Sequence, residues 1–434
     1  MKHHWKYVSK RLALLLMVLF VGTFTLTGCG SGGGSDSYST PGLGKTAPLE
    51  GQSSNVLIDV ATLKSWADQG WVNNTDRYEK VVILQQKSYA DGHIEGAQEW
   101  SLSGVNRIEG PILSGNMVPD GETMDAMLQE RGITANSTIV FMGNNSERIY
   151  FFFRYWGFPK NQLKILNGGT SAWTAAGYSL TKLEPVVAES TFSIKDLLNG
   201  PDRDARASLN EMIVGLEDET IVPFATYSAT SVTDAATVKE TVHGGTEGYV
   251  TFQGRMFDMV QDEVLFASGA ANITTGLYNA DGTYKSKAEM EAYLTSLGAD
   301  GTKPIATYCR AGNLAANGFT PMDAVLDDWK IMLYDGSWSQ WGSLTTRTDV
   351  VPTPEHALPA EYAAWATDWL MSDISFNYDY TDDIYQPEFS FKAPESPRDA
   401  GANNIEDEDY EYWVTPPAGG GGASGPVSGG GGGC

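Results

Sequence analysis

The residue in this sequence with the clearest chemical potential is Cys309, a cysteine followed by a loop of mostly small residues. The loop residues are Arg310, Ala311, Gly312, Asn313, Leu314 and Ala315. A thiolate is a strong nucleophile. Backbone N–H groups of a curled loop, and the amino end of a following helix, stabilise such an anion. We therefore expect Cys309 to be a reactive nucleophile, with Arg310 binding an anionic substrate; the alternative is a buried, inert cysteine.

The other two cysteines, Cys29 and Cys434, each stand alone. Three cysteines are too few for a disulfide scaffold, and no CxxC pair or CxxCH motif suggests a zinc site or a c-type haem. We therefore expect no metal and no cofactor. Cys434 ends a glycine-rich arm, so it is a candidate second thiol that could react together with Cys309, or else an incidental tail residue.

Residues 1–28 have the order of a signal peptide. Basic residues precede an apolar run of about 15 residues, Leu12–Leu26, which is shorter than a membrane-spanning helix. The run ends in Leu26-Thr27-Gly28-Cys29, which resembles the lipobox of bacterial lipoproteins. This resemblance implies cleavage before Cys29, acylation of its sulfur with chains such as palmitate, and a membrane anchor. Because Gly30 and not Asp follows, it implies the outer membrane, on the periplasmic or cell-surface side; an ordinary signal peptide is the alternative.

The net charge and the length of the chain limit the functions and the number of domains that it can have. The chain has 434 residues, with 54 acidic and 29 basic side chains and a net charge of −25. Phosphate backbones bind basic surfaces, so we expect no nucleic-acid partner. The length predicts two to three domains.

Two stretches, 55–185 and 200–347, share a plan of alternating strands and helices. In the first stretch, aliphatic runs predict buried strands at 81–84, 137–142 and 163–166. Helical patterns between them span 123–131 and 149–156. The second stretch repeats the plan, with strands at 305–308 and 331–334 and a helix over 314–326. This alternation predicts an α/β fold in which each parallel sheet is flanked by helices.

The turn after the last strand of each stretch is similar in sequence. Asn167 aligns with Asp335, and Cys309 precedes Asp335 by 26 residues while Met142 precedes Asn167 by 25. This spacing indicates a tandem duplication. Met142 occupies the position of the cysteine, so we expect the first domain to be non-catalytic.

Several motifs resemble the signatures of the two-domain rhodaneses, which include thiosulfate and 3-mercaptopyruvate sulfurtransferases. The motifs are DGHIEGA at 91–97, NGGTSAWTAAGY at 167–178, DGTYKS at 281–286 and YDGSWSQWG at 334–342. The resemblance covers about residues 55–345 and implies two tandem rhodanese-like domains. Together with the lipobox, it implies a membrane-anchored extracytoplasmic sulfurtransferase that moves sulfane sulfur through a Cys309 persulfide, from a small anionic donor to a thiol acceptor.

The loop departs from the family's patterns. Arg310 matches the thiosulfate type, but Ala311 replaces a second cation and Leu314 replaces a hydroxyl residue. We therefore expect slow turnover of thiosulfate or a different donor. A C-x5-R phosphatase is disfavoured, because Ala315 occupies the position of its arginine. Two alternatives remain open: a rhodanese-like lipoprotein handling selenium or tellurium oxyanions, and a non-catalytic subunit of an electron-export or other membrane complex.

The segments outside the two domains have simple compositions. Residues 29–54 read as the lipidated cysteine and a flexible tether, and 418–434 as a disordered glycine-rich tail. Residues 348–417 form an acidic and aromatic appendix, whose run Glu406–Asp409 predicts a solvent-exposed face. Within the second domain, 228–259 reads as an insertion that shapes a pocket, serves a partner or is a plain surface excursion.

Overall fold

The structure is a computed structural model that describes most of the two predicted domains. The described residues are 48–102, 105, 107, 109, 117–143, 146–226, 255–256, 274–346, 367–368, 372–373 and 401–416. The signal peptide, Cys29, most of the 228–259 insertion and the tail with Cys434 lie outside them. All described residues belong to a single structural unit that spans Thr40–Cys434. Among the described residues, no helix has the length and apolar character that crossing a membrane requires.

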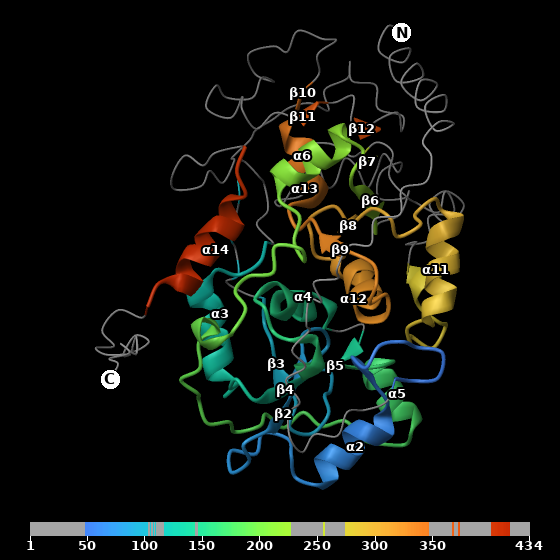
Figure 1. The fold of residues 1–434 in the computed structure, drawn as a ribbon. Coiled ribbons are helices and arrows are strands. Elements are labelled where there is room, and N and C mark those ends of the chain that lie inside the picture. Colours follow the sequence, from blue (N-terminus) through green and yellow to red (C-terminus); the bar gives the residue numbers. More distant parts are fainter. Residues whose placement is uncertain are drawn as a thin grey trace, which may run out of the picture. The chain divides into compact units, whose positions relative to one another are not determined.

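The first half of the chain builds a five-stranded parallel sheet with strand order β1-β5-β4-β2-β3 (Figure 1). The strands are β1 (Leu57–Ile58), β2 (Lys80–Gln85), β3 (Gln98–Glu99), β4 (Ser137–Phe141) and β5 (Leu163–Leu166). Every residue of β2, β4 and β5 is buried, because helices cover both faces of the sheet. This confirms the predicted parallel sheet and its three aliphatic strands.

Among the described residues, four α-helices belong to this sheet. They are α2 (Val60–Asp68), α3 (Gly121–Glu130), α4 (Glu147–Tyr155) and α5 (Gly169–Ala175), with a 3-10 turn η2 (Lys160–Gln162) before β5 and another, η3 (Ile194–Asp196), after the sheet. Asp59 and Asp120 start α2 and α3 by accepting backbone N–H groups from Thr62 and Thr123. Helix α4 is buried on nearly every side. A helix buried all round must pack between two layers, and the second layer is the other half of the chain.

The second half repeats the arrangement with a parallel sheet of strand order β6-β8-β9. Its strands are β6 (Val222–Ala225), β8 (Ile305–Tyr308) and β9 (Ile331–Leu333). Arg206 bridges Leu333 in parallel fashion, as β1 pairs with β5 in the first half. Its helices are α6 (Leu209–Glu217), α10 (Thr274–Leu277), α11 (Lys287–Ser296), α12 (Ala316–Val325) and α13 (Ser337–Leu344). Two short pairs complete the described strands: β7 (Arg255–Met256) with β12 (Ser372–Asp373), and β10 (Thr345–Thr346) with β11 (Thr367–Asp368).

The two halves meet mainly through α4 and α12, which lie side by side (Figure 1). Phe151 and Phe319 pack edge to face with ring centroids 5.2 Å apart. At the other end of the contact, Asp323 accepts a hydrogen bond from Tyr150 (2.7 Å) and pairs with Arg154 (3.0 Å). The helix that follows the first-half loop therefore faces the helix that follows the Cys309 loop.

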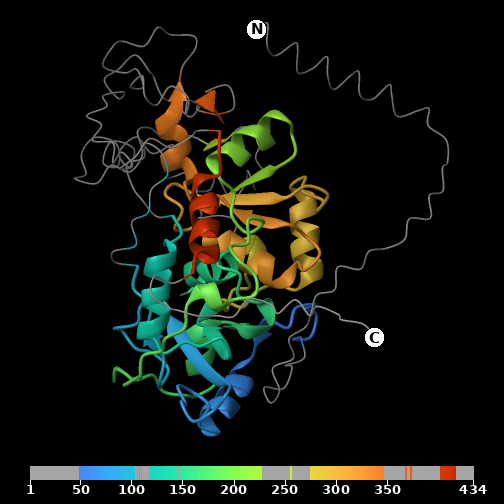
Figure 2. The same cartoon turned by 60° about the vertical axis from the view of Figure 1, so that its left-hand side comes forward.

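The acidic appendix contains a helix, α14 (Asn404–Val414), that runs alongside α3 in both ribbon views (Figures 1 and 2). The predicted solvent-exposed face is wrong for Glu406 and Asp409, which are 0% and 1% exposed. Glu406 pairs with Arg206 (2.6 Å), and Asp409 pairs with Arg107 (2.6 Å). These carboxylates lie three residues apart, so one helix face carries both into the protein, where arginines offset the cost of burial.

The folded part also begins earlier than the predicted boundary at residue 55. Gln52 Nε2 donates to the carbonyl of Lys285 (2.8 Å), and Ser53 Oγ donates to that of Val325 (3.1 Å). Residues 52–54 were predicted as tether, but they attach to the second half through these contacts.

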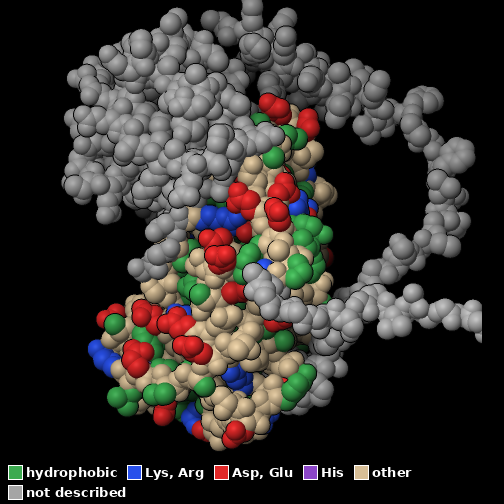
Figure 3. Space-filling view, turned by 90° about the vertical axis from the view of Figure 1, so that its left-hand side faces the viewer, with side chains coloured by type: hydrophobic (Ala, Val, Ile, Leu, Met, Phe, Trp, Pro, Cys, Tyr) green, Lys and Arg blue, Asp and Glu red, His purple; other side chains and the backbone are tan. Residues whose placement is uncertain are grey.

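On the face in Figure 3, acidic side chains are spread over the described surface and basic ones form no large patch there.

Candidate active site

Cys309 follows directly after β8, at the carboxyl end of the second sheet, and is 2% exposed. Its N–H donates to Ser337 Oγ (3.1 Å), and its carbonyl accepts the N–H of Trp338 (3.0 Å). Ser337 Oγ in turn donates to the carbonyl of Tyr334 (2.9 Å). The start of α13 therefore fixes the backbone of Cys309, which explains why the loop and the YDGSWSQWG segment occur together.

Gly312 sets the curl of the loop. Its φ of +82° lies in the left-handed region that side-chain-bearing residues rarely adopt. A Cβ atom at Gly312 would lie 2.1 Å from the carbonyl oxygen of Asp335. Glycine is thus required both by backbone conformation and by contact with the turn after β9.

Backbone donors surround the end of the loop. The N–H groups of Gly312, Asn313, Leu314 and Ala315 have no acceptor among the described residues. Helix α12 starts at Ala316, so its positive amino end lies at the same place. An anion on Cys309 can use these donors in the way that anions use backbone nests.

The predicted loop residues differ in exposure. Ala315 and Gly312 are buried, Arg310 and Ala311 are partly buried, and Asn313 and Leu314 are exposed. Leu314, which stands where relatives have a hydroxyl residue, is 45% exposed. The loop therefore has an apolar side chain on its accessible side.

Arg148, from the first half, reaches the same loop, and the sequence analysis did not single it out. It is 3% exposed, and its Nη1 donates to the carbonyl of Gly312. Burial lowers the pKa of Arg148 to about 10, while the nearby charges of Asp335 and Cys309 act in the opposite direction. The guanidinium therefore stays positive at neutral pH. The signal that could have found it is its place six residues after Met142, in the first turn of α4.

Asp335 is a carboxylate whose charge acts on this cation, but it is already engaged by other groups. Arg206 donates to it from Nε (3.0 Å) and forms an ion pair with it through Nη2 (2.8 Å). The N–H of Val118 donates to its Oδ2 (2.9 Å). Arg206 is itself fully buried and also pairs with Glu406. Asp335 thus holds the turn beneath the loop and is matched to Arg206.

The first-half loop has no nucleophile at the corresponding position. Met142 is completely buried, and its thioether cannot form a persulfide. Glu147, next to Arg148, is also buried, and burial raises the pKa of its carboxyl to about 7. Its Oε2 has no hydrogen-bond partner among the described residues. This carboxyl was another site residue that sequence reasoning missed.

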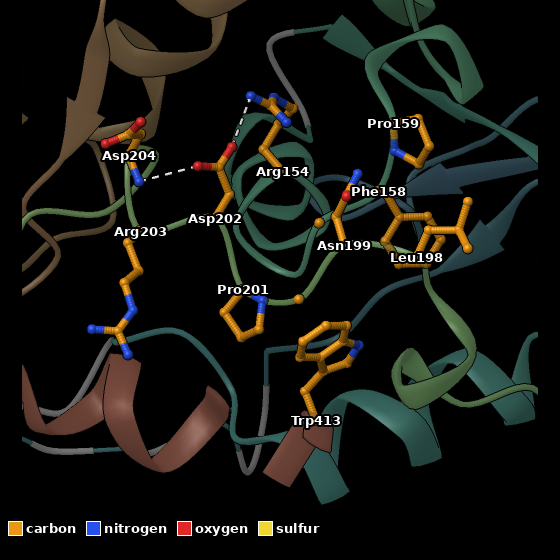
Figure 4. Close-up of a pocket in the computed structure, with 12 residues that line it drawn as sticks. Arg154, Phe158, Pro159, Leu198, Asn199, Pro201, Asp202, Arg203, Asp204 and Trp413 are labelled. Atoms are coloured by element: carbon orange, nitrogen blue, oxygen red, sulfur yellow. Dashed lines mark hydrogen bonds and ion pairs between the residues drawn. The ribbon is translucent and has the colours of Figure 1, made fainter. Parts of the chain in front are cut away.

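A separate cavity of about 570 Å³ opens at the far end of α4 (Figure 4). Arg154 and Asp202 form an ion pair there (3.3 Å), and Asp202 also accepts the N–H of Asp204 (3.0 Å). Trp413 of α14 and Leu198 add apolar walls. None of the Cys309 loop residues lines this cavity, so it is distinct from the loop that carries the thiol. The described residues contain no cluster of three or more metal-ligating side chains.

Known proteins resemble this chain in sequence. The family described as "Rhodanese-like domain" matches residues 53–176, so this segment is a rhodanese-like domain. The chain is 24% identical over 283 residues to the "Putative thiosulfate sulfurtransferase" of Mycolicibacterium smegmatis, covering 63% of this chain and 93% of that relative. It is 27% identical over 294 residues to the sulfur carrier protein TtuD of Thermus thermophilus, covering 63% and 92%.

A solved structure shows a similar fold. The anaerobic ergothioneine biosynthesis enzyme from Chlorobium limicola, in complex with trimethyl histidine, matches with a TM-score of 0.51 and 19% identity. The match covers 67% of this chain and 69% of that enzyme. At this identity the likeness concerns the fold alone. It agrees with the parallel sheets flanked by helices that the motifs predicted.

Proposed function

We propose that this rhodanese-like protein is a sulfurtransferase in which Cys309 carries sulfur as a persulfide. The observation that carries the proposal is the buried Cys309 thiol at the carboxyl end of β8, beside loop N–H groups without acceptors. The cation of Arg148 is hydrogen-bonded to the same loop. Relatives named for thiosulfate sulfur transfer support the same class of reaction.

In the proposed reaction with thiosulfate, the Cys309 thiolate attacks the outer sulfane sulfur. The sulfur–sulfur bond of thiosulfate breaks, and its electron pair leaves with sulfite. A new bond joins the Cys309 sulfur to the transferred sulfur, which keeps one negative charge as the persulfide. An acceptor thiolate then attacks this outer sulfur and restores the Cys309 thiolate. This double displacement needs no external oxidant or reductant.

We expect the sulfur donor to be a small anion. Leu314 brings an exposed apolar side chain to the loop, and Ala311 brings no charge, so we expect thiosulfate to react slowly compared with a bulkier anionic donor. 3-Mercaptopyruvate, which has one carboxylate and a longer body, is such a donor. A selenium or tellurium species attacked by the same thiolate is the alternative substrate.

The experiment is rapid mixing of the purified protein with thiosulfate, followed by measurement of released sulfite. A burst of one sulfite per chain is expected for the native protein and for Cys434→Ser. Cys309→Ser should give no burst. A burst of equal size in Cys309→Ser would contradict the proposal.

We also propose that the protein is a lipoprotein held on the outer membrane through Cys29. The support is the order of basic residues, apolar run and Leu26-Thr27-Gly28-Cys29 in the sequence. Cys29→Ser should move the protein from the membrane fraction to the soluble periplasm and abolish labelling with palmitate. Continued labelling of Cys29→Ser would contradict the anchor. Membrane partners, including subunits of an electron-export complex, are then candidates for the acceptor.

A further inference from the structure

The first half of the molecule has Met142 in place of a reactive cysteine, but it places the buried cation of Arg148 against the Cys309 loop. Arg148 is 3% exposed, and its Nη1 donates a hydrogen bond to the backbone carbonyl of Gly312. Its Nη2 has no hydrogen-bond partner among the described residues. No carboxylate of the described residues forms an ion pair with Arg148. Asp335 forms its ion pair with Arg206 instead. A buried guanidinium with an unused donor and no counter-ion is costly unless an anion joins it.

We propose that Arg148 is the residue that stabilises the anionic sulfur on Cys309, first as thiolate and then as persulfide, across the boundary between the two halves. The inference deepens the proposed function and rests on Cys309 being the reactive thiol. The guanidinium offers Nη2 to the sulfur while Nη1 holds the loop. One side chain therefore couples loop position to charge stabilisation.

This assignment explains the weak charge of the loop itself. Ala311 carries no charge, and Arg310, the remaining loop cation, is partly buried, with its Nε and Nη2 atoms out of contact with solvent. The more deeply a cation is buried, the less water and salt screen its action on a nearby anion. Of the two cations, Arg148 is the more deeply buried residue, at 3% exposure. It also gives the first half a chemical role although Met142 replaces its cysteine.

The packing of the two halves keeps Arg148 in this position. Thr320 Oγ1 of α12 donates to the carbonyl of Glu147 (3.0 Å), so the start of α4 is tied to the helix that follows the Cys309 loop. The guanidinium also stacks near Phe151 and Phe152, at 5.7 and 5.2 Å from their ring centroids. These contacts fix the direction of the side chain towards the second half.

The test compares alkylation of Cys309 by neutral iodoacetamide and by negatively charged iodoacetate. Both rates are read from the Cys309 peptide by mass spectrometry, with Cys434 of the same chain as internal reference. A cation beside the sulfur favours the charged reagent. In Arg148→Met, which keeps an unbranched apolar side chain, we expect the iodoacetate rate to fall about tenfold and the iodoacetate-to-iodoacetamide ratio to fall several-fold. Arg148→Lys should retain part of the ratio.

The matched control is Arg203→Met, which removes the same charge from a side chain that is 44% exposed and pairs with Asp407. It should leave the ratio unchanged. An unchanged ratio in folded Arg148→Met would overturn the inference, as would an equal fall in Arg203→Met. If Arg148→Met does not fold, Arg148→Lys decides: a partial fall in the iodoacetate-to-iodoacetamide ratio supports the inference, and a fully native ratio overturns it. A fallen ratio without any sulfite burst in the native protein would keep the Arg148 inference and reject sulfur transfer from thiosulfate.

Discussion

The loops after β4 and β8 occupy equivalent places in the two halves, yet their contents are complementary. Each loop follows a buried strand and leads into one of the two helices that pack together, α4 and α12. The second loop supplies a thiol at Cys309 and exposes Asn313 and Leu314. The first loop has Met142 at the thiol position, and the first turn of α4 that follows it supplies buried Glu147 and Arg148. With the role proposed for Arg148, both halves contribute residues to one site.

A second pair of equivalent positions shows how the halves are joined. Asn167 Oδ1 accepts the N–H of Tyr284 (2.8 Å), and Asp335 Oδ2 accepts the N–H of Val118 (2.9 Å). Each turn thus binds backbone in the opposite half, two residues before the cap of a helix, α11 or α3. Only the second turn carries a charge, and Arg206 neutralises it. The two turns therefore make equivalent backbone contacts with the opposite half, but only the turn at Asp335 contains a charged side chain.

Of the changes that test this comparison of the two loops, a change at Gly312 should have the largest effect, which is on sulfur uptake by Cys309. Gly312→Ala forces a Cβ against the carbonyl of Asp335, so the loop must move away from α13. We expect sulfur uptake to fall by at least about a hundredfold, because a displacement near 1 Å already has such effects. The measurement is the rate of persulfide formation with thiosulfate.

Gly70 is the matched control for that variant. Its φ of +68° is also in the left-handed region, but a Cβ there would meet nothing within 4 Å. Gly70→Ala should cost about 1 kcal/mol of stability and leave sulfur uptake intact. Equal losses of uptake in both variants would show that backbone strain, and not contact with the Asp335 turn, controls the loop.

Removal of the charge that joins α12 to α4 should have the next largest effect. Burial alone would raise the pKa of Asp323, but Arg154 and Lys160 lower it to about 2. Since the folded value lies below the ordinary one, this stabilisation is present above about pH 4 and disappears as pH falls towards 2. Asp323→Asn should therefore lower the free energy of unfolding at pH 7 by about 3 kcal/mol, measured by urea denaturation.

The control for Asp323 is an exposed carboxylate on the same half. Asp327 is 55% exposed and pairs with Lys287 at 2.8 Å. Asp327→Asn should change stability by less than about 1 kcal/mol, the range of surface ion pairs. Similar losses in the two variants would show that burial between the halves adds nothing to the pair.

The smallest effect is expected when a thiol is installed in the first half. Met142→Cys in a Cys309→Ser background places a cysteine at the equivalent position, but beside the buried carboxyl of Glu147 and with Arg148 directed to the other loop. We expect less than about one tenth of the native sulfur uptake. Uptake near the native rate would mean that the two loops differ only in the residue at this one position.

The sequence predicted the parallel sheets because β2, β4, β5, β8 and β9 are aliphatic runs buried on both faces. It did not predict β6, which is short and contains Pro223; as an edge strand of the described sheet, β6 tolerates a proline. The burial of Glu406 depends on Arg206, 200 residues away in sequence. Arg148 meets Gly312 across 164 residues. Such pairings follow from packing of the halves, which no local pattern encodes.

The central claim is that Cys309 carries the transferred sulfur, and peptide mass mapping tests it most directly. The full chain is exposed in turn to thiosulfate, to 3-mercaptopyruvate, and to selenite with excess glutathione as the reductant, then digested and compared with Cys309→Ser. The account predicts a mass gain of one sulfur, or one selenium, on the Cys309 peptide with at least one donor. A gain found only on the Cys434 peptide, or none with any donor in folded protein, would contradict it.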